Sequence, residues 1–255
     1  MSVPVISEHA IPRPAISVRG LTKSFGDPEG RAHAVDDASF DVPFGSITGF
    51  IGANGSGKTT TMRMIVGLAI PTSGTVIIDG QRYRDLPRPR ARVGAVLDEL
   101  GAHPGLTAYQ HLKVIAIEAG VSMSAIDRTL EVVGLTDARF RKVRTYSTGM
   151  KQRLSLAASM LDEPNIFVLD EPASGLDPMG IRWLRELLRR RADEGAAVFV
   201  STHQLAELAS LVDRVVVIDS GRIVANESST TLLERTGENR LEDAVFAISS
   251  GVATS

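Results

Sequence analysis

The sequence predicts an α/β fold with an inserted helical region and a smaller antiparallel β region. Three observations support this prediction. The β-type run SITGFIG is followed by a glycine-rich loop and by a helical pattern from Lys58 to about Leu68. Later in the chain, the apolar runs NIFVLD, AAVFVST and RVVVID alternate with helical patterns, as expected of parallel strands that are covered on both faces. Between these two parts, the middle third of the chain reads as helices.

The N-terminal part is expected to contain antiparallel strands. Residues 15–42 form short alternating segments that the turn-rich sequence GDPEG interrupts, and GTVIIDG reads as another short strand. Residues 1–14 include three prolines and are expected to form a loose arm. The main domain is therefore expected over residues 15–236, with residues 237–255 as a C-terminal tail.

The helical insertion is expected over about residues 97–162. Thr107 begins a capping box, because a glutamine follows three residues later, and the helix that it opens stops at Gly120. A second helix is predicted over residues 124–134, and a third begins at Ser147 with apolar side chains on one face. After the insertion, two further helical patterns (PMGIRWLRELLRRRADEG and QLAELASLVD) separate the strands, and RVVVIDSGRIVAN predicts a closing hairpin.

The composition excludes several kinds of function. The chain has 255 residues, a formal net charge of −2 and no cysteine. Thiolate catalysis, disulfides and cysteine-ligated metals are therefore excluded, and the charge is unlike the strongly basic footprint of nucleic-acid binding. No apolar run reaches the roughly 18–20 residues that span a bilayer. We expect a soluble protein without a secretory signal, whose membrane role would come through a partner.

The glycine-rich loop GANGSGKT matches G-x-x-x-x-G-K-[ST] at each fixed position, between a predicted strand and a predicted helix. Bare glycine backbone lets successive N–H groups turn toward a polyphosphate, and the helix adds the positive end of its dipole. Lys58 is expected to reach the β- and γ-phosphates, and the Thr59 hydroxyl is expected to ligate Mg²⁺. The alternative, a glycine-rich turn with a surface lysine, is disfavoured by the full spacing. The residues expected to hold the nucleotide here are Gly52, Asn54, Gly55, Ser56, Gly57, Lys58, Thr59 and Thr60.

A second part of the nucleotide site, a metal anchor, is expected where the apolar run IFVL ends in Asp170 and Glu171. Asp170 is expected to hold Mg²⁺, usually through water, and Glu171 to polarise the water that attacks the phosphate. An acidic pair after a strand is commonly only a helix cap, but the phosphate loop upstream favours the metal site.

Phosphate loops serve many protein classes, so the loop alone does not fix the function. The absence of Asn-Lys-x-Asp disfavours a small GTPase. The segment YSTGMKQRL resembles the Leu-Ser-Gly-Gly-Gln signature of the ATP-binding cassette (ABC) family. Ser147 and Gly149 match the signature, whereas Tyr146, Thr148 and Met150 depart from it.

This resemblance implies a RecA-like P-loop NTPase core with an antiparallel β subdomain and an inserted α-helical subdomain. It implies ATP and Mg²⁺ as ligands. It also implies a head-to-tail pair, identical or not, in which Ser147 and Gly149 face the γ-phosphate held by the other subunit. An N-capped amphipathic helix is the plainer alternative for this segment.

Three further positions match the family's order, and a fourth departs from it. Phe25 resembles the aromatic residue that stacks on adenine, with an ordinary core phenylalanine as the alternative. Asp177, in SGLD, resembles the aspartate that crosses to the partner's phosphate loop, and His203 resembles the switch histidine at the γ-phosphate. Asp98 stands where the family normally has a glutamine, and we expect it to keep a metal-ligand role.

The resemblance therefore implies an ATP-hydrolysing subunit that powers a separately encoded membrane permease from the cytoplasmic face of the cell membrane. Asp98 together with YSTGM resembles the subgroup (ABC-2 type) that exports drugs, antibiotics or other amphipathic compounds. One alternative is a non-transport member of the family, acting in assembly or on nucleic acid or ribosomes, although no nucleic-acid partner is expected. Another is a P-loop kinase or phosphotransferase that acts as a monomer.

Overall fold

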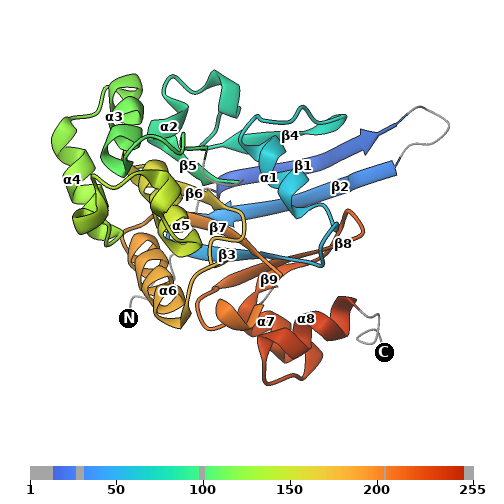
Figure 1. Ribbon diagram of the computed structural model, residues 1–255. Coiled ribbons are helices and arrows are strands. Elements are labelled where there is room, and N and C mark those ends of the chain that lie inside the picture. Colours follow the sequence, from blue (N-terminus) through green and yellow to red (C-terminus); the bar gives the residue numbers. More distant parts are fainter. Residues whose placement is uncertain (1–13, 27–31, 98–100, 204, 250–255) are drawn as a thin grey trace, which may run out of the picture.

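The structure is a computed structural model that describes residues 14–26, 32–97, 101–203 and 205–249. It confirms the predicted α/β fold: a six-stranded sheet forms the centre and a three-stranded antiparallel sheet covers part of it (Figure 1). The strands of the central sheet are, in spatial order, β5 (Val93–Val96), β6 (Ile166–Leu169), β7 (Ala197–Thr202), β3 (Ser46–Ile51), β8 (Arg214–Asp219) and β9 (Arg222–Ser228). Neighbouring strands are parallel except for β8 and β9, which form the predicted hairpin.

The smaller sheet has the spatial order β2 (Ala32–Pro43), β1 (Pro14–Phe25) and β4 (Ser73–Ile78), with both pairings antiparallel. It confirms the strands predicted in the N-terminal part of the chain. Most of the predicted GDPEG loop, and nearly all of the predicted N-terminal arm, lie outside the described residues.

One face of the central sheet packs against α1 (Lys58–Ile65) and the antiparallel sheet. Phe40, Phe50 and Phe199, from β2, β3 and β7, meet there with ring centroids 5.0 to 5.6 Å apart. All three side chains are buried, so this aromatic cluster ties the two sheets together. This packing fixes the position of β3 and β7, whose carboxyl ends carry candidate site residues.

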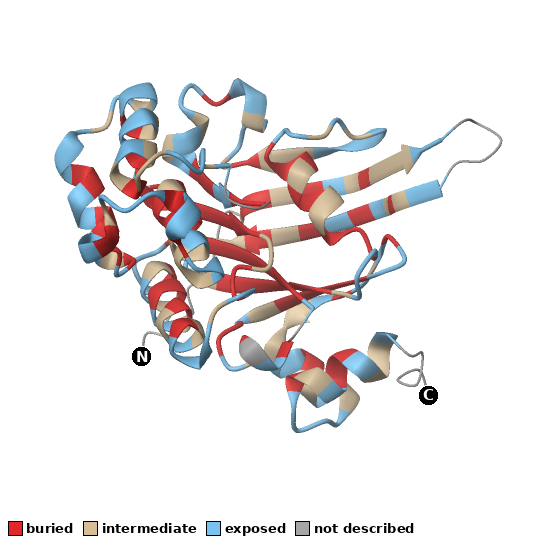
Figure 2. Ribbon diagram, in the orientation of Figure 1, coloured by how far each residue is buried: buried red, intermediate tan, exposed pale blue. Residues whose placement is uncertain are grey.

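Helices cover the other face, where alternate strand residues such as Val198 and Val200 point. Figure 2 shows the buried residues running along the central strands and along the inner sides of these helices. Three helices of the middle third gather at one end of the molecule, namely α3 (Ala108–Ala119), α4 (Met123–Val132) and α5 (Thr148–Met160) (Figure 1). The remaining helices are the short α2 (Pro89–Arg92), α6 (Pro178–Asp193), α7 (Ser229–Thr236) and α8 (Leu241–Ser249).

The helix predicted over residues 204–213 is wrong for the part that the structure describes. That part holds only a 3₁₀ turn, η4 (Leu205–Glu207), and further turns. The N–H of Leu208 donates to the carbonyl of Leu205 at 2.9 Å, and the N–H of Leu211 to that of Leu208 at 2.8 Å. Leucines three residues apart have the period of 3₁₀ turns, which a helical pattern resembles over a short span.

Two other boundaries differ from the prediction. Helix α1 ends at Ile65 rather than near Leu68, because Gly67 takes a positive φ of 72° and turns the chain away. The segment expected to be a tail contains α8. Its residues Leu241 and Ala244 are buried, and such i, i+3 spacing gives the helix an inner face.

Candidate active site

The carboxyl ends of three neighbouring parallel strands meet at one edge of the central sheet. Asp170 and Glu171 follow β6, His203 follows β7, and the glycine-rich loop follows β3. Open α/β sheets bind ligands at this edge. The fold therefore brings together chemical groups from three distant parts of the sequence.

Two glycines of the loop are required by close backbone approach. A Cβ atom on Gly52 would lie 2.3 Å from the carbonyl oxygen of Ile218. A Cβ atom on Gly57 would lie 2.3 Å from the carbonyl oxygen of Ala34, and Gly57 also has a φ of 107°. Gly57 is the N-cap of α1, so the loop delivers free N–H groups and the positive helix end to one place.

Lys58 is folded into the loop that it belongs to. Its side chain is buried, and its ammonium group donates to the carbonyl oxygens of Gly52 at 2.7 Å and Ala53 at 3.0 Å. Burial lowers the pKa of Lys58, while the charges of Glu171 and Asp170 act in the opposite direction. The loop thus holds the Lys58 ammonium close to its own backbone carbonyl groups.

Asp170 is held by two hydroxyl groups from different elements. Thr59, in the first turn of α1, donates to Asp170 Oδ2 at 2.6 Å. Ser201, in β7, donates to Asp170 Oδ1. The backbone N–H of Glu171 donates to the hydroxyl of Ser201 at 3.0 Å. One hydroxyl therefore touches both acidic residues.

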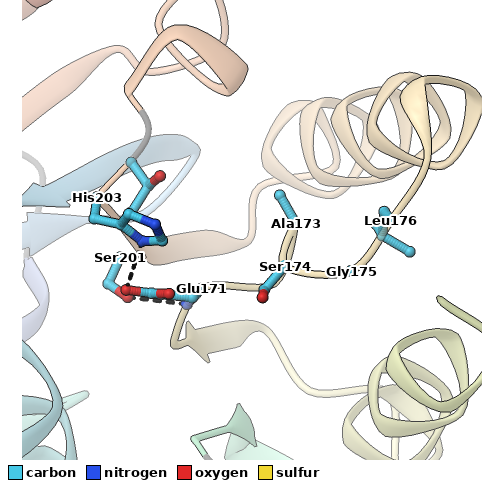
Figure 3. A pocket seen from close by; sticks show the side chains of 8 residues that line it. Glu171, Ala173, Ser174, Gly175, Leu176, Ser201 and His203 are labelled. Carbon is cyan, nitrogen blue, oxygen red and sulfur yellow. Dashed lines mark hydrogen bonds and ion pairs between the residues drawn. The ribbon is translucent and has the colours of Figure 1, made fainter. Parts of the chain in front are cut away.

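Glu171 has an unusual backbone conformation and a defined side-chain partner. Its φ is 48°, in the left-handed region that non-glycine residues seldom adopt. Its Oε1 lies 2.9 Å from Nδ1 of His203. Figure 3 shows both side chains at a small pocket that Ser174 and Gly175 also line.

The two helix starts predicted as contacts to a second subunit face outward. Ser147 caps α5 and accepts the N–H of Met150 at 3.2 Å, and Asp177 caps α6 and accepts the N–H of Gly180 at 2.7 Å. Both residues are exposed. The start of α5 and the segment before α6 lie close together. A Cβ atom placed on Gly149 would lie 3.3 Å from the carbonyl oxygen of Gly175.

The remaining predicted residues are found as follows. Phe25 is not a core residue, since its side chain is 55% exposed at the end of β1 with the ammonium of Lys23 5.2 Å from its ring centre. Asn54 and Gly55 are exposed in the loop, and Thr60 is half-buried in α1. Asp98 lies outside the described residues.

Ser201 belongs to the candidate site, but no local sequence motif marks it. It lies within the run AAVFVST, which reads as an apolar strand throughout. A hydroxyl two residues before the candidate switch histidine, at the carboxyl end of a buried strand, is the signal that would have found it.

Comparison with known proteins decides the family. The sequence model described as ABC transporter matches residues 35–174, which is more than half of the chain. The chain belongs to the ABC transporter family. It is an ATP-binding cassette and an ATPase.

Several relatives of this cassette carry the names of antibiotic or drug systems. It is 38% identical over 223 residues to the bacitracin transport ATP-binding protein BcrA of Enterococcus faecalis, covering 86% of this chain and 71% of the relative. It is 36% identical over 242 residues to the daunorubicin/doxorubicin resistance ATP-binding protein DrrA of Streptomyces peucetius, covering 91% and 72%.

The fold of the cassette matches solved structures. A structure described as the ATP binding subunit of an ABC transporter superposes with a TM-score of 0.81 at 29% identity, covering 92% of this chain and 99% of that one. Within the described residues, no helix of the cassette is long and apolar enough to cross a membrane.

Proposed function

We propose that this cassette binds Mg·ATP in the loop of residues 52–60 and hydrolyses it in concert with a second cassette. The observation that carries the proposal is the connected set Thr59–Asp170–Ser201–Glu171–His203, which joins the phosphate loop to an acid and a histidine. The set contains a metal-binding pair and a base beside one phosphate loop, as phosphoryl transfer requires.

The residues of the loop fit a polyphosphate. Ser56 is buried, and within the described part of the chain its hydroxyl has no hydrogen-bond partner. Lys58 directs its ammonium to carbonyl oxygens of the loop, which a phosphate oxygen can replace as acceptor. Glycine backbone and a helix start supply the remaining donors.

The residues also fit Mg²⁺. The Thr59 hydroxyl and the Asp170 carboxylate are hard oxygen ligands whose oxygens lie 2.6 Å apart. When bound, Mg²⁺ would neutralise charge on the β- and γ-phosphates. Asp98 is proposed as a further ligand on its position in the sequence alone.

Catalysis is assigned to Glu171, His203 and Lys58. The Glu171 carboxylate would accept a proton from the attacking water, as a general base positioned at the end of β6. His203 is 2.9 Å from that carboxylate, so it would orient Glu171 and reach toward the terminal phosphate. Lys58 would stabilise negative charge on the transferred group.

The second cassette would complete the site. Ser147 and Asp177 are exposed at the starts of α5 and α6, where each side chain caps its own helix. We assign Ser147 and Gly149 to the γ-phosphate held by the partner, and Asp177 to the partner's phosphate loop. Phe25, exposed at the end of β1, is assigned to the adenine ring.

The proposed partner in transport is a membrane permease, with the cassette at the cytoplasmic face of the membrane. The names of the relatives support export of a drug, an antibiotic or another amphipathic compound. An open groove between β5, α3 and α5, lined by Leu68, Ile115 and Ala158, would receive a cytoplasmic segment of the permease. Leu68 is 69% exposed there, which suits an apolar contact.

Replacing Glu171 tests the assignment of the base. Glu171→Gln is expected to lower the ATP hydrolysis rate by about 10² to 10⁴, the usual contribution of a general base. Affinity for ATP should stay near that of the wild type, because the amide keeps the size of the carboxylate. Rates and ATP binding would be measured on the purified chain.

Glu186→Gln is the matched control, because Glu186 is exposed on α6 and pairs only with Arg182 among the described residues. It should hydrolyse ATP at the wild-type rate. Normal turnover by Glu171→Gln would remove Glu171 from the base role.

A further inference from the structure

Ser201 is fully buried in β7, yet its hydroxyl donates a hydrogen bond to one residue of the candidate site and accepts one from another. Its hydroxyl donates to Asp170 Oδ1 and accepts the N–H of Glu171 at 3.0 Å. Figure 3 shows the Ser201 side chain beside Glu171 and below His203. Its neighbours in the strand, Phe199 and Val200, are apolar core residues.

A buried hydroxyl in the neighbouring strand makes no comparable contacts with the residues that the structure describes. Thr48, in the adjacent strand β3, is also fully buried, and its hydroxyl has no partner among the described residues. Burying a hydroxyl costs free energy unless it is hydrogen-bonded. Among the described residues, Ser201 offsets this cost through Asp170 and the backbone of Glu171.

We propose that Ser201 is a positioning residue that sets the orientation of the metal-binding carboxylate and of the general base together. This inference rests on the proposed function of Asp170 and Glu171. Ser201 itself touches neither nucleotide nor water in the proposed mechanism.

The effect on Asp170 follows from its two contacts. With Thr59 on Oδ2 and Ser201 on Oδ1, the plane of the carboxylate is fixed at both oxygens. Without the Ser201 hydroxyl, the Thr59 contact restrains only Oδ2, so the carboxylate turns more easily about its Cβ–Cγ bond. Mutating a residue that orients a metal ligand in this way typically costs about 10- to 100-fold in metal affinity or activity.

The effect on Glu171 follows from its backbone. A φ of 48° is unfavourable for glutamate, so surrounding contacts must maintain it. The hydrogen bond from its N–H to Ser201 is one such contact, and the N–H of Ser174, which donates to the Glu171 carbonyl at 3.0 Å, is another. Loss of the Ser201 hydroxyl would allow the Glu171 side chain to leave its place beside His203.

The test compares nucleotide binding with and without Mg²⁺. Affinity for a non-hydrolysable ATP analogue would be measured by calorimetry in excess Mg²⁺ and in EDTA, for wild type and Ser201→Ala. In EDTA the two proteins should bind within about threefold of each other, because the phosphate loop is unchanged. The gain in affinity on adding Mg²⁺ should fall about tenfold in Ser201→Ala, the lower end of the range for residues that orient a metal ligand.

Hydrolysis gives a second readout. The kcat of Ser201→Ala should fall about 10- to 100-fold, and the Mg²⁺ concentration that gives half-maximal activity should rise. Thr48→Val removes a buried hydroxyl from the neighbouring strand without touching the site, and it should match the wild type in both measurements. Ser201→Thr keeps the hydroxyl and should retain most of the Mg²⁺-dependent gain.

A Ser201→Ala protein with the full Mg²⁺-dependent gain would overturn the inference. So would a Ser201→Thr protein that binds normally in EDTA yet loses the gain as completely as Ser201→Ala. If the wild-type chain itself bound no ATP analogue, the proposed function would fall with it. If the wild type binds and Ser201→Ala is unaltered, only the role of Ser201 is lost.

Discussion

Glu171 illustrates how single residues in this cassette hold conformations that their own chemistry disfavours. Its left-handed backbone costs on the order of 1–3 kcal/mol. The same conformation directs its carboxylate to His203 and its N–H to Ser201. The unfavourable backbone therefore lies at the residue proposed as the general base.

Replacing Gly52 tests whether the close backbone approach in the loop is needed for ATP binding. In Gly52→Ala the new Cβ atom would meet the carbonyl oxygen of Ile218 at 2.3 Å, so the loop must shift. Such overpacking costs about 1–3 kcal/mol. We expect ATP affinity to fall about tenfold or more, since about 1.4 kcal/mol corresponds to a factor of ten. Calorimetric titration with ATP measures the change.

Gly101→Ala is the control, because a Cβ atom there would meet no atom within 4 Å and its φ is not in the left-handed region. It should bind ATP as the wild type does. Equal affinity for ATP in Gly52→Ala would contradict the close approach that the loop geometry implies.

Individual site residues were predictable where a local motif marks them. Lys58 and Thr59 lie in a spaced motif, and Asp170 and Glu171 end an apolar run. Ser201 was not predictable, because its role depends on contacts with residues 30 and 31 positions away in the sequence. Only the neighbouring positions of β6 and β7 in the sheet reveal it.

Helices α5 and α7 each begin with a serine N-cap, so the effect of losing the cap can be compared between them. Ser147 accepts the N–H of Met150 at the start of α5, and Ser228 accepts the N–H of Thr231 at the start of α7. Replacing either serine by alanine should lower the free energy of unfolding by about 1 kcal/mol, the usual cost of losing an N-cap. Denaturant unfolding measures both losses.

Only Ser147→Ala should also lower the hydrolysis rate per chain, because α5 is the helix proposed to meet the partner's nucleotide. If Ser147→Ala and Ser228→Ala had the same hydrolysis rate, Ser147 would be only a structural cap.

Helices and strands were predicted well where capping and burial patterns agree. The capping box at Thr107 and the αL glycine at Gly120 bound α3 as expected. The prediction failed at residues 205–213, where leucines three residues apart lie in a 3₁₀ turn and the turns that follow it, not in a helix. It also failed to find α8, a short helix whose inner face is buried only in the folded chain.

Across the whole molecule, the residues of the candidate site fall into two groups that lie apart. The phosphate loop, Asp170 and Glu171 are connected within one chain, whereas Ser147 and Asp177 cap helices at the surface. The helical region is tied to the core by Arg153 of α5, whose guanidinium stacks on Trp183 of α6 at 4.2 Å. In the proposed function, a second copy of these surface groups completes the site around the terminal phosphate.

The most direct test of ATP-driven pairing is the mass of Glu171→Gln in solution, measured by light scattering after size exclusion. Monomers are expected without nucleotide, and dimers with saturating Mg·ATP, because ATP stays bound when hydrolysis is blocked. Adding Ser147→Ala to Glu171→Gln should return the protein to monomers in Mg·ATP. A Glu171→Gln protein that remains monomeric although ATP is bound, or a double variant that dimerises equally well, would contradict a nucleotide clamped between two chains.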